Sequence, residues 1–110
     1  MPNRNQTLVR FLNVLNAIRD LAPYNKLSAE EEILLYELIT RWQEQGTLAV
    51  SDVMNNAHRA CSTTIYRRLV SLQKKGFVTL KNENSDKRVK YVKPAPTCIS
   101  YMELLNKGLK

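Results

Sequence analysis

Basic side chains, which bind polyanions, are concentrated in one stretch of the chain, residues 62–93. This stretch holds nine Lys and Arg against two acidic residues, so its formal charge of +7 equals the net charge of all 110 residues. Residues 1–60 carry six basic and seven acidic residues and are nearly neutral. A basic field confined to one region is typical of a nucleic-acid-binding surface. The plainer interpretation is a solvated charged face. The predicted structure of the stretch favours nucleic-acid binding over this interpretation.

One helix and one hairpin are predicted within the basic stretch. The helix runs over residues 62–75 and ends at Gly76. Segments 77–81 and 88–93 alternate between apolar and polar residues, which predicts two strands joined by a turn at 82–86. The buried stripe of the helix recurs at i, i+4 and i+7 and consists of Ile65, Leu69 and Leu72.

A shorter helix is predicted before this one, so that the two form a helix-turn-helix over residues 51–75. Ser51 and Asp52 offer the cap of the first helix, and the turn is expected at 58–61. The hairpin, residues 77–93, follows directly. A helix-turn-helix followed at once by a two-stranded hairpin is a winged helix.

Two more helices are predicted to flank this unit, over residues 6–22 and 97–109, each with one apolar stripe. Another helix begins at the capping box Ser28-Ala29-Glu30-Glu31 and ends at Gly46. Its apolar face is broad, so it should lie at the centre of the core, and a short strand is expected at 47–50. We therefore predict one domain, 1–110, mainly α with a small β-hairpin: a winged helix-turn-helix with added N- and C-terminal helices.

The basic stretch also carries a family resemblance. Residues 62–69 lead into Leu72-Gln73-Lys74-Lys75-Gly76-Phe77-Val78, and the predicted turn holds Asp86-Lys87-Arg88. In these segments the chain resembles the MarR family of winged-helix transcription regulators, over about residues 48–92. The first segment looks like the family's recognition helix with its Leu-x-x-x-Gly-apolar exit into the wing. The second is similar to its Asp-x-Arg wing signature.

The resemblance implies a homodimer, a recognition helix in the major groove and a wing arginine, here Arg88, in the minor groove. It supports Asp86 as the residue that orients Arg88. Many members of the family also bind a small-molecule effector between the dimer and DNA regions, and whether this chain does so is left open. The family usually ends in long dimerisation helices, and the last predicted helix here, 97–109, is shorter.

The outward face of the predicted recognition helix supplies the candidate DNA contacts. Arg67 is expected to contact guanine through its planar guanidinium, with a phosphate contact as the alternative. Ser62, as N-cap at a helix N-terminus, favours a phosphate, and Tyr66 is expected either to bind phosphate or to pack on the wing. Arg68 lies beside the buried stripe, so an internal role is equally expected. The recognition-helix set is Ser62, Thr63, Thr64, Tyr66, Arg67, Arg68 and Ser71.

The wing supplies the second candidate surface. Lys87, Arg88 and Lys90 should approach the DNA backbone, and a narrow minor groove attracts the Arg88 guanidinium. Asp86 would repel phosphate, which favours an orienting role for it.

The two flanking helices should form the dimer, because a single small domain has few places to bury both of their stripes. The alternative is that both fold back onto their own subunit. The expected dimerisation residues are Leu8, Phe11, Leu12, Leu15, Ile99, Met102 and Leu105.

No catalytic, metal or cofactor site is predicted. His58 is the only histidine, and Cys61 and Cys98 are too few and too far apart for a zinc site. Cys61 is expected to be a buried structural cysteine, with a redox switch as the alternative. No apolar run is long enough for a membrane span and the N-terminus lacks a secretory signal, which predicts a cytoplasmic protein.

These features predict a sequence-specific double-stranded DNA-binding transcription regulator, most simply a repressor, that acts as a homodimer on a palindromic site. One rival is a DNA-binding accessory factor for plasmid or phage replication, maintenance or transfer. Another is a winged helix used for protein or RNA contact, which predicts weak duplex binding.

Overall fold

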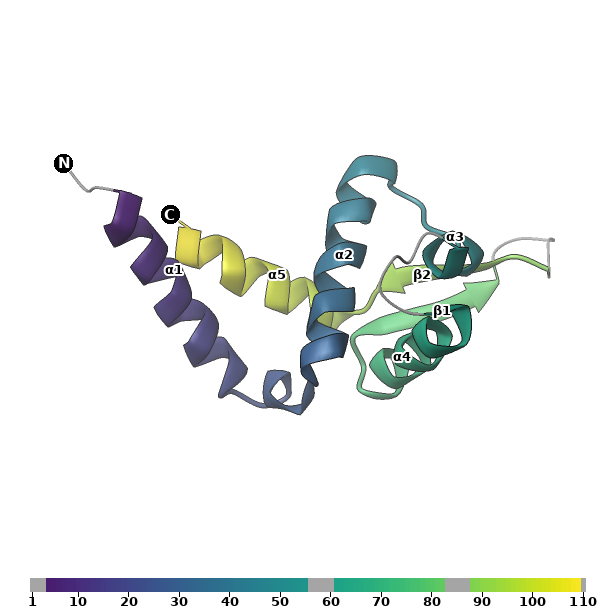
Figure 1. Ribbon diagram of the computed structural model, residues 1–110, viewed down its shortest axis with the longest axis horizontal. Coiled ribbons are helices and arrows are strands. Elements are labelled where there is room, and N and C mark those ends of the chain that lie inside the picture. Colours follow the sequence, from purple (N-terminus) through teal and green to yellow (C-terminus); the bar gives the residue numbers. More distant parts are fainter. Residues whose placement is uncertain (1–3, 56–60, 83–87, 110) are drawn as a thin grey trace.

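The computed structural model describes residues 4–55, 61–82 and 88–109. It measures 53 × 27 × 26 Å, and in Figure 1 a two-helix arm projects from a body that holds the other elements. In chain order the elements are α1 (Arg4–Arg19), the 3-10 turn η1 (Tyr24–Lys26), α2 (Ala29–Gln45), α3 (Val50–Asn55), α4 (Ser62–Lys74), β1 (Val78–Asn82), β2 (Lys90–Pro94) and α5 (Pro96–Leu109).

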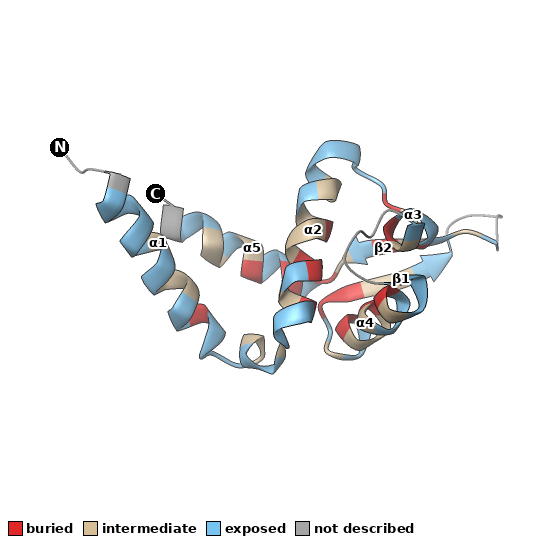
Figure 2. Ribbon diagram, viewed as in Figure 1, coloured by how far each residue is buried: buried red, intermediate tan, exposed pale blue. Residues whose placement is uncertain are grey.

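Helix α2 is the central element of the body. Its predicted capping box is confirmed: the Ser28 side chain accepts a hydrogen bond from Glu31 N, and the Glu31 carboxylate accepts one from Ser28 N at 2.8 Å. Figure 2 shows buried residues where α2, α4, the hairpin and the start of α5 meet. On α2 the buried residues are Leu34, Leu35 and Leu38, which belong to its predicted broad apolar face, and the acidic residue Glu31. Gly46 ends the helix at φ +78°, a conformation that favours glycine.

Helices α3 and α4 begin at different residues from those predicted. In α3 the Ala49 carbonyl accepts hydrogen bonds from Asp52 N and Val53 N, so the helix begins at Val50 and Ser51 is not its cap. In α4 the N-cap is the extended residue Cys61, and Ser62 is the first helical residue. Ser62 was the expected cap, but hydrogen bonding starts one residue earlier, with Ile65 N donating to Cys61 O at 3.0 Å. The predicted turn at 58–61 lies, except for Cys61, outside the described residues.

Strands β1 and β2 form the predicted antiparallel hairpin, paired from Val78↔Pro94 to Asn82↔Lys90. The predicted strand at 47–50 is reduced to one bridge, Ala49↔Tyr91, with Val92 N donating to Leu48 O at 2.9 Å. The strands end one residue later than expected, and most of the predicted turn lies outside the described residues.

The arm consists of α1 and α5, which pack together in opposite directions (Figure 1). Helix α1 ends at Arg19 and not at residue 22. After Arg19, Leu21 N donates to Ile18 O, and Pro23 disfavours helical geometry at the residue before it. Ile18, Cys98 and Tyr101 are buried where the arm joins the body.

This packing engages part of the predicted dimerisation set within the subunit, and the dimer itself stays a prediction. Met102 and Leu105 pack against the core of their own subunit, and Phe11 and Leu15 are half-buried, because α1 and α5 cover each other. Leu8, Leu12 and Ile99 stay exposed, at 54%, 45% and 46%.

The fold is therefore mainly helical with a small two-stranded antiparallel hairpin, and its element order is compatible with a winged helix. Among the residues described, no helix combines the length and the apolar character needed to cross a membrane.

Candidate nucleic-acid interface

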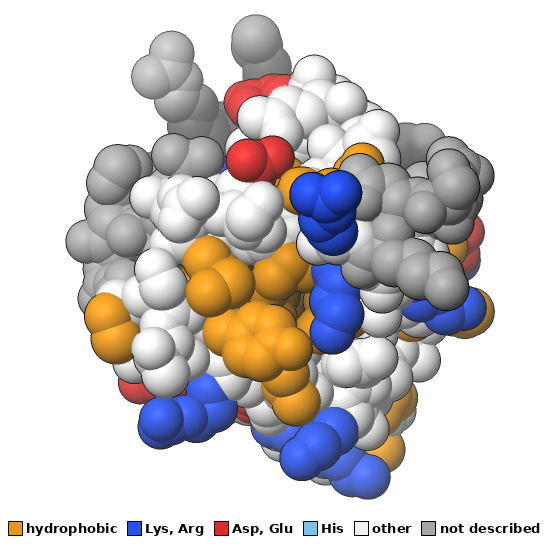
Figure 3. All heavy atoms as spheres, turned by 90° about the vertical axis from the view of Figure 1, so that its right-hand side faces the viewer, with side chains coloured by type: hydrophobic (Ala, Val, Ile, Leu, Met, Phe, Trp, Pro, Cys, Tyr) orange, Lys and Arg blue, Asp and Glu red, His pale blue; other side chains and the backbone are white. Residues whose placement is uncertain are grey.

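The outward face of α4 carries polar and basic side chains over its first two turns. Burial of Ile65, Leu69 and Leu72 confirms the predicted helix phase. Ser62, Thr63 and Arg67 are exposed, and so is Tyr66, whereas Arg68 is half-buried. In Figure 3, which views this end of the molecule, basic side chains border an apolar patch. The face can offer a guanidinium and hydroxyl groups to a polyanion.

The N-cap of α4, Cys61, differs from its expected burial. Cys61 is exposed, so the expectation of a buried structural cysteine is wrong. Its Sγ lies 3.2 Å from the Thr64 hydroxyl, and this hydrogen bond lowers the pKa of the thiol. Thr64 is thereby engaged locally, and the Ser62 hydroxyl donates to Met54 O at 3.4 Å. Cys98 is buried, and burial raises its thiol pKa to about 11.

The last turns of α4 face α2 through Ser71, which corrects its predicted place on the DNA-facing side. The half-buried Ser71 hydroxyl donates to Glu31 Oε2. One turn later Lys75 Nζ lies 2.5 Å from Glu31 Oε1 and donates to Lys26 O at 2.7 Å. Ser71 and Lys75 therefore bind the protein itself.

The Glu31 carboxylate accepts the hydrogen bonds from both Ser71 and Lys75, and only 4% of the residue is exposed. Burial would by itself raise the pKa of its carboxyl group. Hydrogen bonds from Lys75, Ser71 and Ser28 outweigh that effect and lower the pKa to about 2. The carboxylate is thus ionised at neutral pH and holds the end of α4 against the start of α2. From the sequence, only capping and helix-dipole roles are predicted for Glu31. The missed signal is its position on the same helix face as Leu34, Leu35 and Leu38.

The described part of the hairpin, the predicted wing, carries Arg88 and Lys90, both exposed. The Asn82 side chain donates to Val89 O at 3.2 Å across the hairpin. Strand β2 of the hairpin is bound to α2, because Trp42 Nε1 donates a hydrogen bond to Val92 O at 3.0 Å. Asp86 and Lys87 lie outside the described residues, so their predicted roles stay predictions.

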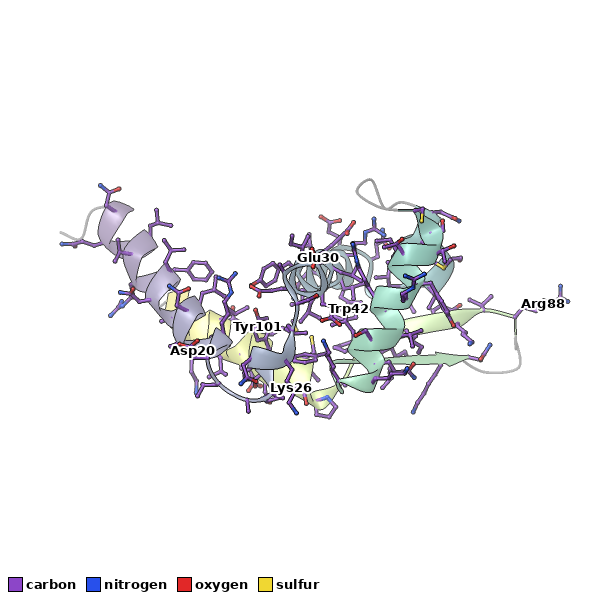
Figure 4. The ribbon with its side chains drawn as sticks, turned by 60° about the horizontal axis from the view of Figure 1, so that its bottom comes forward. Asp20, Lys26, Glu30, Trp42, Arg88 and Tyr101 are labelled. Atoms are coloured by element: carbon purple, nitrogen blue, oxygen red, sulfur yellow. The ribbon has the colours of Figure 1, made fainter. Side chains whose placement is uncertain are left out.

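The beginning of α4, the end of β1 and the beginning of β2 lie at the end of the molecule away from the arm (Figure 1). Figure 4 shows Arg88 at the far end of the hairpin and Lys26 near the opposite, C-terminal end of α4. The beginning of α4 and Arg88 thus lie at the same end of the body, and Arg67, in the second turn of α4, is exposed.

A second polar network, which was not predicted from the sequence, joins the arm to the body. Arg19 of α1 donates to Glu32 Oε1 at 2.5 Å, and the Tyr36 hydroxyl also donates to that carboxylate. The hydroxyls of Tyr36 and buried Tyr101 lie 2.9 Å apart. No sequence motif indicates this network, because its members come from α1, α2 and α5.

No known family model matches the chain, and no curated protein is similar enough in sequence to count as a relative. Within the described ranges, no three His, Cys, Asp or Glu side chains are grouped so that they could hold a metal ion.

The buried carboxylate predicts a pH dependence of stability. Because folding lowers the pKa of Glu31 from 4.5 to about 2, its ionised form stabilises the fold above pH 4.5, and this contribution is lost as the pH falls toward 2. Urea unfolding of the wild type and of Glu31→Gln measures it. The difference in unfolding free energy should shrink by about 2–3 kcal/mol between pH 5 and pH 2.

Glu30→Gln, which removes an exposed carboxylate from the same turn, is the matched control. A wild-type advantage over Glu31→Gln that stays constant across this pH range would contradict the account.

Proposed function

We propose that the chain is a winged-helix protein of MarR type that binds double-stranded DNA and regulates transcription, most simply as a repressor. In this proposal α2, α3, α4 and the hairpin form the winged helix, and α4 is the recognition helix. The observation that carries the proposal is charge placement. The net charge of residues 62–93 equals that of the whole chain, and Arg67, Arg88 and Lys90 are exposed. The beginning of α4 lies at the same end of the body as Arg88 (Figures 1 and 4). In this proposal the protein acts in the cytoplasm by binding DNA, and it catalyses no reaction.

Arg67 is the proposed base-reading residue, since it is exposed in the second turn of α4 and its guanidinium matches the two acceptors of guanine. Ser62, Thr63 and Tyr66 border it on the same helix and are proposed to bind phosphate. The half-buried Arg68 is assigned a supporting role through its packed stem.

The wing is proposed to complete the interface through phosphate and minor-groove contacts. Arg88 enters the minor groove, oriented by Asp86, and Lys87 and Lys90 lie along the backbone. Lys75 is excluded from the contact set, because its ammonium group is paired with Glu31.

A homodimer is proposed through the part of the arm that the subunit leaves uncovered. On α1, Leu8, Val9 and Leu12 are 45–54% exposed and continue the apolar stripe beyond the side that α5 covers. Burying each such side chain contributes roughly 1.5–3 kcal/mol. A twofold axis through the arm would set two α4 helices on successive major grooves of a palindromic site.

Duplex binding should weaken steeply with salt. If roughly five basic side chains per subunit neutralise phosphates, a dimer covers about ten, and the log–log slope of affinity against salt approaches about −9. Fluorescence anisotropy with a short duplex measures this slope. A salt response that is flat would remove the main support for nucleic-acid binding and would favour a protein-contact role.

Arg67→Ala should erase the preference at one base position of the sites selected from random duplexes. The expected loss of discrimination is about 1–3 kcal/mol at that position. Lys107→Ala, which removes an exposed positive charge from α5, is the control and should leave the preference intact. Equal weakening at all sequences by Arg67→Ala would make Arg67 a phosphate contact.

Sedimentation velocity should show a dimer at tens of micromolar, and Leu12→Lys should convert it to a monomer. A charge at this position cannot be buried against a second apolar helix without a large desolvation penalty. Ala17→Lys adds the same charge on the exposed opposite side of α1 and should leave the dimer intact. A wild-type monomer would refute the dimer.

A further inference from the structure

Helix α4 is held in two physically different ways. Ile65, Leu69 and Leu72 bury its inner face, and such apolar contacts are non-directional. The hydrogen bonds to Glu31 are directional and fix how far the helix is rotated about its axis. One donor, Ser71, lies in the last turn of the helix, and the other, Lys75, is the C-cap residue that follows it.

These donors and the proposed base-reading residue, Arg67, are regularly spaced along the sequence. Arg67, Ser71 and Lys75 follow one another at intervals of four, so successive residues lie about 40° apart around the axis of α4. Ser71 and Lys75 reach Glu31, whereas Arg67 is exposed. A rotation that breaks the bonds of Ser71 and Lys75 to Glu31 therefore also turns the Arg67 side chain away from its present direction.

The two kinds of DNA contact differ in their sensitivity to such a rotation. A bidentate hydrogen bond to a base edge requires fixed geometry, whereas attraction to the phosphate backbone tolerates displacement. A residue that sets the rotation of α4 should thus control discrimination between sequences far more than overall affinity.

We propose that Glu31 is a positioning residue for base reading, and that it acts by holding Ser71 and Lys75 so that Arg67 faces the groove. This inference rests on the proposed function and deepens it. Glu31 itself touches no DNA. Its carboxylate joins the capping box of α2 to the last turns of α4, and Lys75 extends the link to Lys26 in η1.

The test compares Ser71→Ala with the wild type on two duplexes, the best selected site and the same site with one base pair changed. Ser71→Ala removes the hydroxyl and keeps the capping box and the Lys75 ion pair. The ratio of the two affinities should fall by about tenfold, within the 1–3 kcal/mol of one base contact. Affinity for a random duplex should change less than twofold.

Three further variants separate positioning from a loss of stability. Ser71→Thr restores a hydroxyl and should restore the ratio. Lys75→Met removes the other donor and should lower the ratio, which keeps the test available if Ser71→Ala unfolds. Glu37→Gln breaks the ion pair to Arg41 on the same helix α2 and should leave the ratio unchanged.

The inference is overturned if the wild type discriminates between the duplexes and the ratio of the two affinities is unchanged in both Ser71→Ala and Lys75→Met. The proposed function would then still stand. Equal weakening on all duplexes would overturn the inference as well, since that is the result of lost stability alone. A wild type that binds no duplex, or binds all equally, would overturn the proposed function together with the inference.

Discussion

One buried carboxylate, that of Glu31, joins the start of α2 to the end of α4. A buried charge costs several kcal/mol in lost hydration unless it is paired and hydrogen-bonded. Glu31 meets this requirement with the Ser28 backbone amide, the Ser71 hydroxyl and the Lys75 ammonium group. The same helix carries Trp42, whose indole donates to Val92 in the wing. The two residues are eleven positions apart, about 16 Å along the helix axis. Helix α2 therefore positions α4 through one of its ends and the hairpin through the other, and both halves of the proposed interface depend on it.

Local signals in the sequence predicted most of the body. The capping box, the stripe of α4 and the end of α2 at Gly46 each depend on residues within a few positions of one another, so pattern alone could reveal them. Helix phase likewise placed Arg67 outside the core correctly. The helix starts predicted for α3 and α4 were displaced. Ser51 and Ser62 have side chains typical of caps, but the first hydrogen-bonded carbonyls belong to Ala49 and Cys61.

Contacts between distant segments explain the errors. Ser71 was assigned to the DNA-facing side by its phase, but its partner is 40 residues away on another helix. The network of Arg19, Glu32, Tyr36 and Tyr101 joins three helices and leaves no local pattern. In the arm, the apolar periodicity of α1 and α5 was read correctly. Periodicity does not say what covers a stripe, however, and Met102 and Leu105 proved to pack within the subunit.

The central claim is that the outward face of α4 and the wing together receive double-stranded DNA. It is tested most directly by following the backbone amide signals of the protein by nuclear magnetic resonance while a short duplex carrying a selected site is added. The account predicts that the signals of residues 62–68 and 88–90 shift most, and that those on the solvent side of α1 and α5 stay in place. Shifts centred on the arm, or the absence of shifts at low salt, would contradict it.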